Sequence, residues 1–403
     1  DGIKTFIVPS NMRHRELLLL KPDYILYPNH RDTTDGEISI LKKANISIGV
    51  LETEQCVNDV FFEKYQIPKK LSSRNDIEDF FVWGEYFLKL CIDRNWYSNK
   101  QVKVIGSPKH DRYSSSHKLD SNKIYDLLIA TSFPNSNPLF GESVSRKMYQ
   151  NLGMKNSEID EFTNLHKVNV QNMIQFINKN LSDTKLNILL RVHPYEQNFE
   201  FYKNSIKGKN IEIDDGRNTI YESLNKSKIL IHFNSTSCLD AQAMGIPSIN
   251  MSWMPQLEVF HESTEVMSLV SYLPETESEC MQLISGILNK KIELKIQNDS
   301  QELEEYIFKF DGLASIRCAE IIKNSLNSKN KEVNFNLNQK TFLENFNLRN
   351  LIISSILKNR WKNSRKYFNK RLVEQSLKRS GKIINSKNAK VGWIDLSSVE
   401  LLE

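Results

Sequence analysis

The chain has 403 residues, 39% of them hydrophobic and 26% charged, and its formal net charge is +5. This length exceeds what one hydrophobic core usually serves, so two domains are expected, and the composition is that of an ordinary globular protein. The charge is too small and too scattered to indicate nucleic-acid binding. No apolar run reaches the roughly 20 residues that span a bilayer.

The cysteines and the first residues bear on cellular location and on where the domain begins. The five cysteines are widely separated and form no C-x-x-C pair. We therefore expect reduced thiols in a cytoplasmic protein, with neither a disulfide framework nor a zinc site. The first residues, "DGIKTFIVPS", lack a Met and enter a predicted strand at once. We expect an opening strand and helix to precede residue 1.

Short apolar runs alternate with helix-like segments in the first third of the chain. This alternation is typical of a parallel α/β sheet. The predicted strands are "KTFIVPS" (4–10), "DYILYP" (23–28), "ISIGVLE" (46–52), "DFFVWG" (79–84) and "VKVIGS" (102–107).

The same pattern restarts after a polar stretch at 107–123. Amphipathic segments such as 168–181 separate the apolar runs and predict helices. Two doubly wound α/β units in tandem would place a ligand at the carboxyl ends of their strands. The predicted strands are "IYDLLIAT" (124–131), "LNILLRVHP" (186–194), "NIEIDDG" (210–216), "KILIHFNS" (228–235) and "IPSINM" (246–251).

The last part of the chain has a different composition. Residues 325–340 read as a polar linker, and residues 348–382 combine an apolar face with many Lys and Arg. Two interpretations of the tail remain open. It is either a solvated helical appendage or a basic amphipathic helix that rests on an anionic membrane surface or on a partner.

The stretch "HFNSTSCLDAQAMGIPSIN" (232–250) predicts an anion site. An apolar strand ends at Asn234, a helix follows, and Ser235, Thr236 and Ser237 stand at its start. Hydroxyls and free backbone N–H groups at a helix N-terminus favour negative charge. Helix capping would account for one hydroxyl but not for three. We therefore expect phosphate binding here, with Asp240 accepting hydrogen bonds from a ribose.

His193 ends another predicted strand, within "ILLRVHPYE" (188–196). A histidine there can donate to a phosphate or protonate a departing one, and Pro194 fixes the turn that aims it. Arg191 and Glu196 would support this loop. A lone strand-end histidine is more often structural, but the hydroxyl-rich helix start in the same unit favours the functional interpretation.

These motifs resemble those of the glycosyltransferases with the two-domain GT-B fold that use CMP-activated sugars, especially the Kdo transferases of capsule and lipopolysaccharide assembly. The resemblance rests on "RVHPYE" (191–196) and "NSTSCLDAQAMGIP" (234–247). Three stretches of the first domain add to it, namely "GVLETEQ" (49–55), "DFFVWGEY" (79–86) and "VKVIGSPKHDRY" (102–113). It covers roughly residues 20–330.

The resemblance implies an α/β fold of two Rossmann-like doubly wound domains that face a cleft. The acceptor-side domain would span 1–115, the nucleotide-sugar domain 120–330, and a basic, partly helical extension 331–403. The implied reaction is metal-independent, retaining transfer of Kdo or a related ulosonic acid from a CMP-sugar to a glycan or glycolipid acceptor. No cofactor is implied apart from this donor. The enzyme would act in the cytoplasm, with peripheral membrane contact through its tail.

Carboxylates are needed for the chemistry itself, because glycosyl transfer uses one near the anomeric carbon and a second group for the acceptor proton. The resemblance implies Asp111 as nucleophile and Glu54 as acid/base, with Glu52 and His110 beside the site. Asp214 and Asp215 read as a turn. Each of these carboxylates could instead be a surface group.

Two other functions stay open. The donor could be a UDP- or GDP-sugar or of the CDP-glycerol type, or the chain could be a non-catalytic glycan-binding or scaffold module. No metal-ligand spacing, G-x-G-x-x-G or Walker motif occurs, so metal, dinucleotide and ATP sites are not expected. The aromatic residues of the tail are not interleaved with its basic residues in the way that would indicate nucleic-acid binding.

Overall fold

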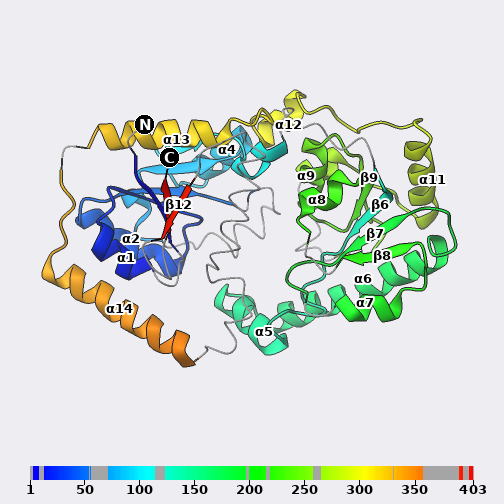
Figure 1. Cartoon of the computed structure of the whole chain (residues 1–403), viewed down its shortest axis with the longest axis horizontal. Helices are drawn as coiled ribbons and strands as arrows, with labels where there is room; N and C mark the ends of the chain where they lie inside the picture. Colours follow the sequence, from blue (N-terminus) through cyan, green and yellow to red (C-terminus); the bar gives the residue numbers. More distant parts are fainter. Residues whose placement is uncertain are drawn as a thin grey trace.

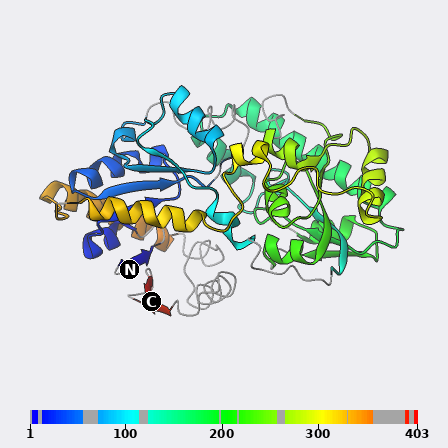
Figure 2. The ribbon, with the colours of Figure 1, turned by 90° about the horizontal axis from the view of Figure 1, so that it is seen from above.

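The computed structural model describes residues 3–8, 13–53, 55, 71–113, 123–196, 199–214, 218–256, 265–329, 331–356, 390–393 and 399–402. Its described strands form two parallel sheets and one small antiparallel sheet. Figures 1 and 2 show the parallel sheets in two separate α/β bodies, which we call the first and second domains.

The first domain contains a four-stranded parallel sheet in which each strand pairs with the next along the chain. Its order is β2-β3-β4-β5. Its inner positions are apolar and almost fully buried, for example Ile48, Val50 and Phe80, as expected for a sheet covered by helices. The strands are β2 (Tyr24–Tyr27), β3 (Ser47–Leu51), β4 (Asp79–Val82) and β5 (Val102–Val104), and the helices between them are α2 (Asp32–Lys43) and α4 (Glu85–Asp93), with α1 (Arg13–Leu20) before β2.

The second domain contains a six-stranded parallel sheet in the order β11-β10-β9-β6-β7-β8. Counted from β6, this is the 3-2-1-4-5-6 order of doubly wound nucleotide-binding folds. The strand order reverses between β6 and β9, because β7 and β8 are added on one side of β6 and β9 to β11 on the other. Ligands bind at the carboxyl ends of the strands at such a point. The strands are β6 (Tyr125–Ala130), β7 (Ile188–Arg191), β8 (Ile211–Asp214), β9 (Ser227–His232), β10 (Ser248–Asn250) and β11 (Ser271–Tyr272).

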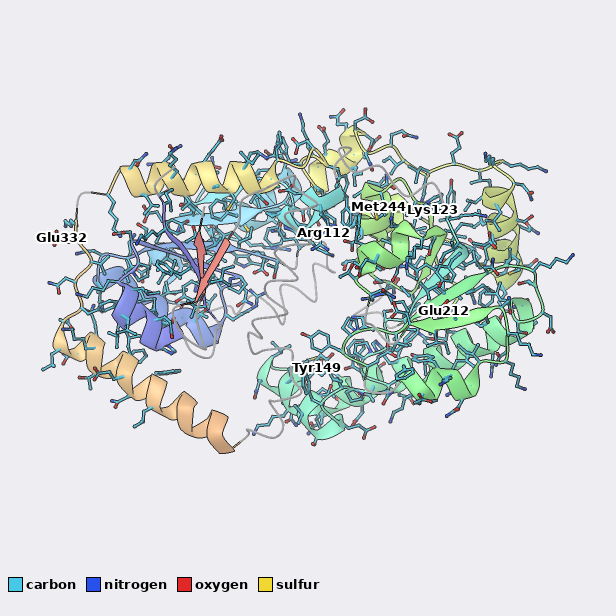
Figure 3. The ribbon with its side chains drawn as sticks, viewed as in Figure 1. Arg112, Lys123, Tyr149, Glu212, Met244 and Glu332 are labelled. Atoms are coloured by element: carbon cyan, nitrogen blue, oxygen red, sulfur yellow. The ribbon has the colours of Figure 1, made fainter. Side chains whose placement is uncertain are left out.

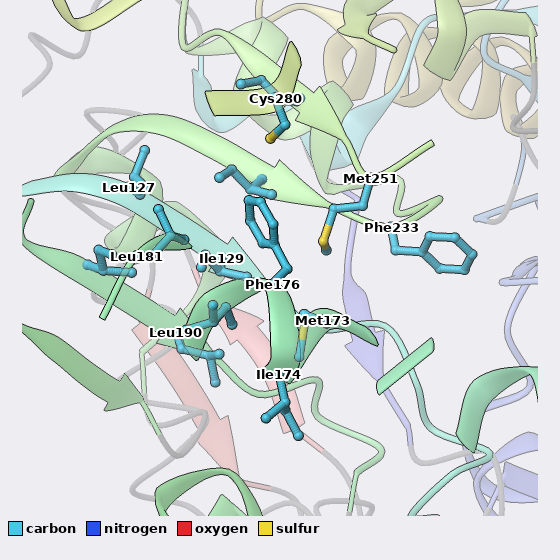
Figure 4. Close-up of a cluster of buried hydrophobic side chains, with 14 of the residues drawn as sticks. Leu127, Ile129, Met173, Ile174, Phe176, Leu181, Leu190, Phe233, Met251 and Cys280 are labelled. Carbon is cyan, nitrogen blue, oxygen red and sulfur yellow. The ribbon is translucent and has the colours of Figure 1, made fainter. Parts of the chain in front are cut away.

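Helices cover both faces of this second sheet. The 25-residue α6 buries Met173, Phe176 and Ile177 against the strand residues Ile129 and Leu190, as Figure 4 shows for part of this core. The helices are α5 (Glu142–Asn151), α6 (Asn156–Asn180), α7 (Phe199–Ser205), α8 (Ile220–Asn225), α9 (Ser237–Ala243), α10 (Glu265–Val270), α11 (Glu277–Leu288) and α12 (Gln301–Tyr306).

The predicted strand at 4–10 does not join the parallel sheet. β1 (Thr5–Ile7) pairs antiparallel with β13 (Val399–Leu402), which in turn pairs with β12 (Lys390–Trp393). The physical reason is exposure, because Thr5 and Ile7 stay exposed whereas a strand inside a parallel α/β sheet is buried on both faces. The prediction of a strand was right and the prediction of its partner was wrong.

The polar segment at 325–340 is not a linker throughout. α13 (Ala314–Asn327) continues into it, and Phe335 is buried in the first-domain core, as is Leu343 of α14 (Leu337–Ile356). Cys318 of α13 packs against Phe81 and Ile105 of the first domain. The chain thus returns to the first domain within the range predicted for the second, because a few apolar side chains suffice to dock a polar helix.

The two domains meet where Gly84 precedes α4. A Cβ atom at Gly84 would lie 2.3 Å from the carbonyl oxygen of Glu305 and 2.5 Å from backbone atoms of Tyr306 in α12. Backbone atoms cannot move aside as a flexible side chain can, so this close approach requires glycine. This close contact between the two backbones explains why a glycine stands at position 84 of the "DFFVWGEY" stretch.

We expect Gly84→Ala to destabilise the protein by about 1–3 kcal/mol, the usual cost of overpacking. Gly36 within α2 is the matched control, since its added Cβ would meet no atom within 4 Å. Gly36→Ala should be neutral or stabilise by up to about 1 kcal/mol, because alanine favours helix. Urea denaturation of both variants measures the difference. Equal stability of the two variants would contradict the close contact.

In the part of the chain that the structure describes, every helix is too short or too polar to traverse a bilayer. Of the predicted tail helix, the structure describes only residues 348–356, at the end of α14.

Candidate active site

The carboxyl ends of β6, β7 and β9 meet at one edge of the second sheet. Ala130, the last residue of β6, lies opposite Arg191 of β7 and His232 of β9. The three loops that leave this edge therefore begin side by side. They carry Thr131, His193 and Ser235 at the point where the strand order reverses.

Glu196 holds two of these loops together. Its buried carboxylate accepts hydrogen bonds from the Thr131 hydroxyl at 2.7 Å, from the Phe133 backbone N–H at 3.0 Å and from the Tyr202 hydroxyl. Burial raises the pKa of Glu196, and its hydrogen bonds partly oppose that rise. Thr131 in turn accepts a 2.8 Å hydrogen bond from the backbone N–H of His193. Glu196 therefore fixes where the His193 backbone lies.

The tautomer of His193 follows from its neighbours. Its Nδ1 atom accepts a hydrogen bond from the backbone N–H of Tyr195 at 3.2 Å, which leaves the proton on Nε2. Burial, with a smaller effect of the Arg191 charge, lowers the pKa of His193 to about 4. The imidazole is thus neutral at pH 7 and can donate a hydrogen bond from Nε2. Such a donor can bind a phosphate oxygen.

Arg191 is half-buried at the end of β7. Its guanidinium donates to the backbone carbonyl of Asn218 at 3.4 Å. The side chain thereby connects β7 with the loop that follows β8, in keeping with a supporting position.

The Ser-Thr-Ser loop after β9 is held by side-chain contacts. Asn234 adopts a left-handed conformation with φ +42°, and its backbone N–H donates to the Asn250 side chain at 3.0 Å. The backbone N–H of Ser235 donates to Nδ1 of His232 at 3.2 Å. The Ser235 and Ser237 hydroxyls lie 2.9 Å apart. The loop thus presents a fixed pair of hydroxyls at the start of α9.

Capping accounts for little of this loop. Thr236 is the N-cap residue of α9, yet its side chain makes no capping hydrogen bond. The Ser235 hydroxyl accepts a 3.3 Å hydrogen bond from the backbone N–H of Ser237, which is the one contact here that resembles capping. The loop contains more hydroxyl groups than its helix requires.

Asp240, which was predicted to contact a ribose, binds two side chains from the end of the first domain. Its side chain is 1% exposed, and it accepts hydrogen bonds from the Tyr113 hydroxyl at 2.5 Å and from Lys109 Nζ at 3.0 Å. Both partners belong to the 3-10 helix η3 (Pro108–Tyr113), which follows β5. His110 of the same helix is buried beside Asp240, and burial lowers the pKa of His110 to about 4. Asp240 thus faces η3, where the first domain supplies the Lys109 cation and the Tyr113 hydroxyl.

Two predicted carboxylates are engaged in structural contacts. Glu52 is buried and holds Arg31 through two hydrogen bonds of 2.9 and 3.1 Å. Asp111 accepts the backbone N–H groups of Ala314 at 3.0 Å and of Ser315 at 2.7 Å. These bonds satisfy free donors at the start of α13, which is a capping role.

Of the remaining predicted carboxylates, the structure describes only Asp214. Asp214 accepts hydrogen bonds from Asn218 at 3.2 Å and from Ser223 at 3.4 Å. Glu54 and Asp215 lie outside the described residues. The structure therefore gathers Thr131, His193 and Ser235 at one edge but brings none of the predicted carboxylate catalysts to them among the residues it describes.

The sequence analysis missed His166 on α6. Its ring packs edge-on against Phe133 with centroids 5.9 Å apart, and Nδ1 accepts the backbone N–H of Asn135 at 3.4 Å. Burial, and then the nearby His193, lowers its pKa to about 3. His166 thus packs behind the loop that follows β6, close to His193. No sequence signal distinguishes it from other residues on the inner face of an amphipathic helix.

Among the described residues, no three or more His, Cys, Asp or Glu side chains are grouped so that they could hold a metal ion. The described cysteines, Cys91, Cys238, Cys280 and Cys318, are all buried free thiols.

Comparison with known proteins defines the fold class. A protein from Listeria monocytogenes assigned as a UDP-N-acetylglucosamine 2-epimerase superposes with a TM-score of 0.52 and 13% identity, over 81% of each chain. S. aureus MnaA, solved with UDP, gives 0.50 and 14%, over 79% of this chain and 80% of that chain. The wall teichoic acid polymerase TagF gives 0.42 and 15%, over 76% of this chain and 72% of that chain.

The chain has a GT-B-like α/β fold, as its two parallel sheets and the superpositions on the L. monocytogenes protein and on MnaA establish. No protein-family model matches the sequence, and no curated protein matches it.

Proposed function

We propose that this protein is a glycosyltransferase that binds a nucleotide-linked sugar at the carboxyl ends of β6, β7 and β9. The observation that carries the proposal is the neutral His193 with its proton on Nε2, across β6 from the Ser235–Ser237 hydroxyl pair. Strands two positions apart in a sheet are separated by about 10 Å. Side chains that reach inward from both can contact the same phosphate group.

His193 has the properties that stabilise a leaving phosphate. Its imidazole is a neutral N–H donor whose orientation is fixed in advance by Tyr195, Thr131 and Glu196. Preorganised donors of this kind stabilise charge that develops in the transition state without reorganising. The proposal rests on leaving-group stabilisation rather than on a carboxylate nucleophile, since Asp111 caps α13.

The resemblance of the sequence motifs supports a finer assignment. We propose a CMP-linked ulosonic acid such as Kdo as the donor, and a glycan or glycolipid of the bacterial surface as the acceptor. Such an acceptor would be met at the cytoplasmic face of the membrane, and the basic residues at 348–382 would favour contact with anionic lipid. No cofactor or metal enters the proposed reaction.

A UDP-linked substrate is the second candidate. Two structural neighbours are named for UDP-sugar epimerisation or were solved with UDP. The same phosphate contacts would serve a UDP-sugar. Contacts to the nucleotide base would then decide between UDP and CMP.

A nucleotide panel tests the donor. We expect CMP to raise the melting temperature more than UDP, GDP or CDP at equal concentration. A hundredfold excess over Kd corresponds to about 2.7 kcal/mol of stabilisation. A preference for UDP would replace the CMP assignment with the second candidate. No response to any of the four nucleotides would leave the non-catalytic module as the better interpretation.

A further inference from the structure

Asp240 connects the predicted phosphate loop to the first domain. It lies on α9, one helical turn after Ser237, whose hydroxyl is paired with that of Ser235. Its carboxylate accepts hydrogen bonds from Tyr113 and Lys109 of η3. A single buried carboxylate thus joins the helix that starts at the phosphate loop to the end of the first domain.

This contact lies where the chain passes between the domains. η3 is the last described element before β6, so the first passage starts there. The return passage runs from α12 to α13 and brings Phe310 edge-on against His110, with ring centroids 5.4 Å apart. Figure 3 labels Arg112 of η3 and Met244 at the end of α9 in this region. Both passages therefore lie beside Asp240.

His110 is an unsatisfied group in this contact. It is 3% exposed, and neither ring nitrogen has a hydrogen-bond partner among the described residues. Its Nε2 atom lies 3.7 Å from Asp240 Oδ1, just beyond hydrogen-bonding distance. Leaving a buried polar group unpaired costs free energy. A small shift of the His110 ring or of the Asp240 carboxylate would complete a bond between them.

We infer that Asp240 is a positioning residue that couples the Ser235–Ser237 loop to the first domain, so that nucleotide affinity depends on Tyr113 and Lys109. This inference rests on the proposed function and adds to it a role for residues at the domain boundary. Ligand at the phosphate loop would favour the contact between α9 and η3, and this contact would favour ligand binding in return.

A double-mutant cycle tests the coupling. Asp240→Asn and Tyr113→Phe should each weaken binding of the nucleotide chosen by the panel by about tenfold, the scale of a hydrogen bond to a charged group. The double variant should be no weaker than the more affected single variant, because both changes remove one interaction. Tyr125→Phe is the matched control, since its hydroxyl bonds the exposed Glu212 within the second domain. The control should bind as the wild type does.

Hydrogen exchange supplies a readout that needs no ligand. Amides of α9 and η3 should exchange faster in both Asp240→Asn and Tyr113→Phe, and unchanged exchange would overturn the tether. Weakened binding in Asp240→Asn alone, with Tyr113→Phe normal, would instead make Asp240 a direct ligand of the nucleotide. Faster exchange with normal affinity in both variants would overturn the coupling. If the wild type binds no nucleotide, the proposed function fails, and exchange alone decides whether Asp240 tethers α9.

Discussion

His193→Ala is expected to lower turnover by about a hundredfold or more, while nucleotide affinity falls much less. The reason is that a preorganised donor acts mainly on the charge that develops as the nucleotide leaves, and losing one such donor costs about this much. The variant should remain folded, because the backbone N–H that bonds Thr131 is retained and the side chain is only partly buried.

His193→Gln is the matched control for His193→Ala. The glutamine amide can donate near the position of Nε2, so this variant should recover part of the lost turnover. The measurement is steady-state turnover of the donor chosen by the panel, with nucleotide affinity determined on both variants. Near-normal turnover in His193→Ala would reduce the "RVHPYE" stretch to a strand end without a role in catalysis.

Acid should destabilise the protein steeply below about pH 6.5. Burial lowers the pKa of five histidines, to about 4 for His30, His110 and His193 and to about 3 for His166 and His232. Between these values and the ordinary value of about 6.5, the unfolded chain binds protons that the folded chain does not. Stability therefore rises with pH in this window and is lost as pH falls through it.

Each of these histidines contributes at most about 1.4 kcal/mol per pH unit in that window. Urea denaturation at pH 7, 6 and 5 measures the slope. His166→Gln should reduce the slope by about one proton, because one buried imidazole is removed. A stability that does not change between pH 7 and 5 would contradict the burial of these side chains.

The sequence predicted the elements that depend on local patterns. Apolar runs located every strand from β2 to β10, because a buried parallel strand reads as a continuous apolar segment. The two-residue β11 (Ser271–Tyr272) was missed, since a strand that short leaves no pattern. The proline after His193 and the run of hydroxyl residues after β9 also directed attention to His193 and Ser235, which lie at one edge of the second sheet.

The contacts that the sequence could not predict join residues far apart in the chain. Tyr113 and Asp240 are 127 positions apart, and Asp111 is 203 positions from Ala314. A carboxylate at a strand end looks the same in sequence whether it awaits a substrate or caps a distant helix. Only the tertiary packing distinguishes these roles, as the contacts of Asp111 and Asp240 illustrate.

The pairing of β1 with β13 determines how domain motion in this protein can be observed. Because the first and last described strands lie side by side, as the chain ends do in Figure 1, labels fused at the two ends would report on one small sheet. Their separation would stay constant while α9 and η3 approach or part. A spectroscopic ruler for closure would need one dye on the second domain, for example at an exposed position of α11 such as Glu279, and the other on the first domain, for example at the exposed Lys43 of α2.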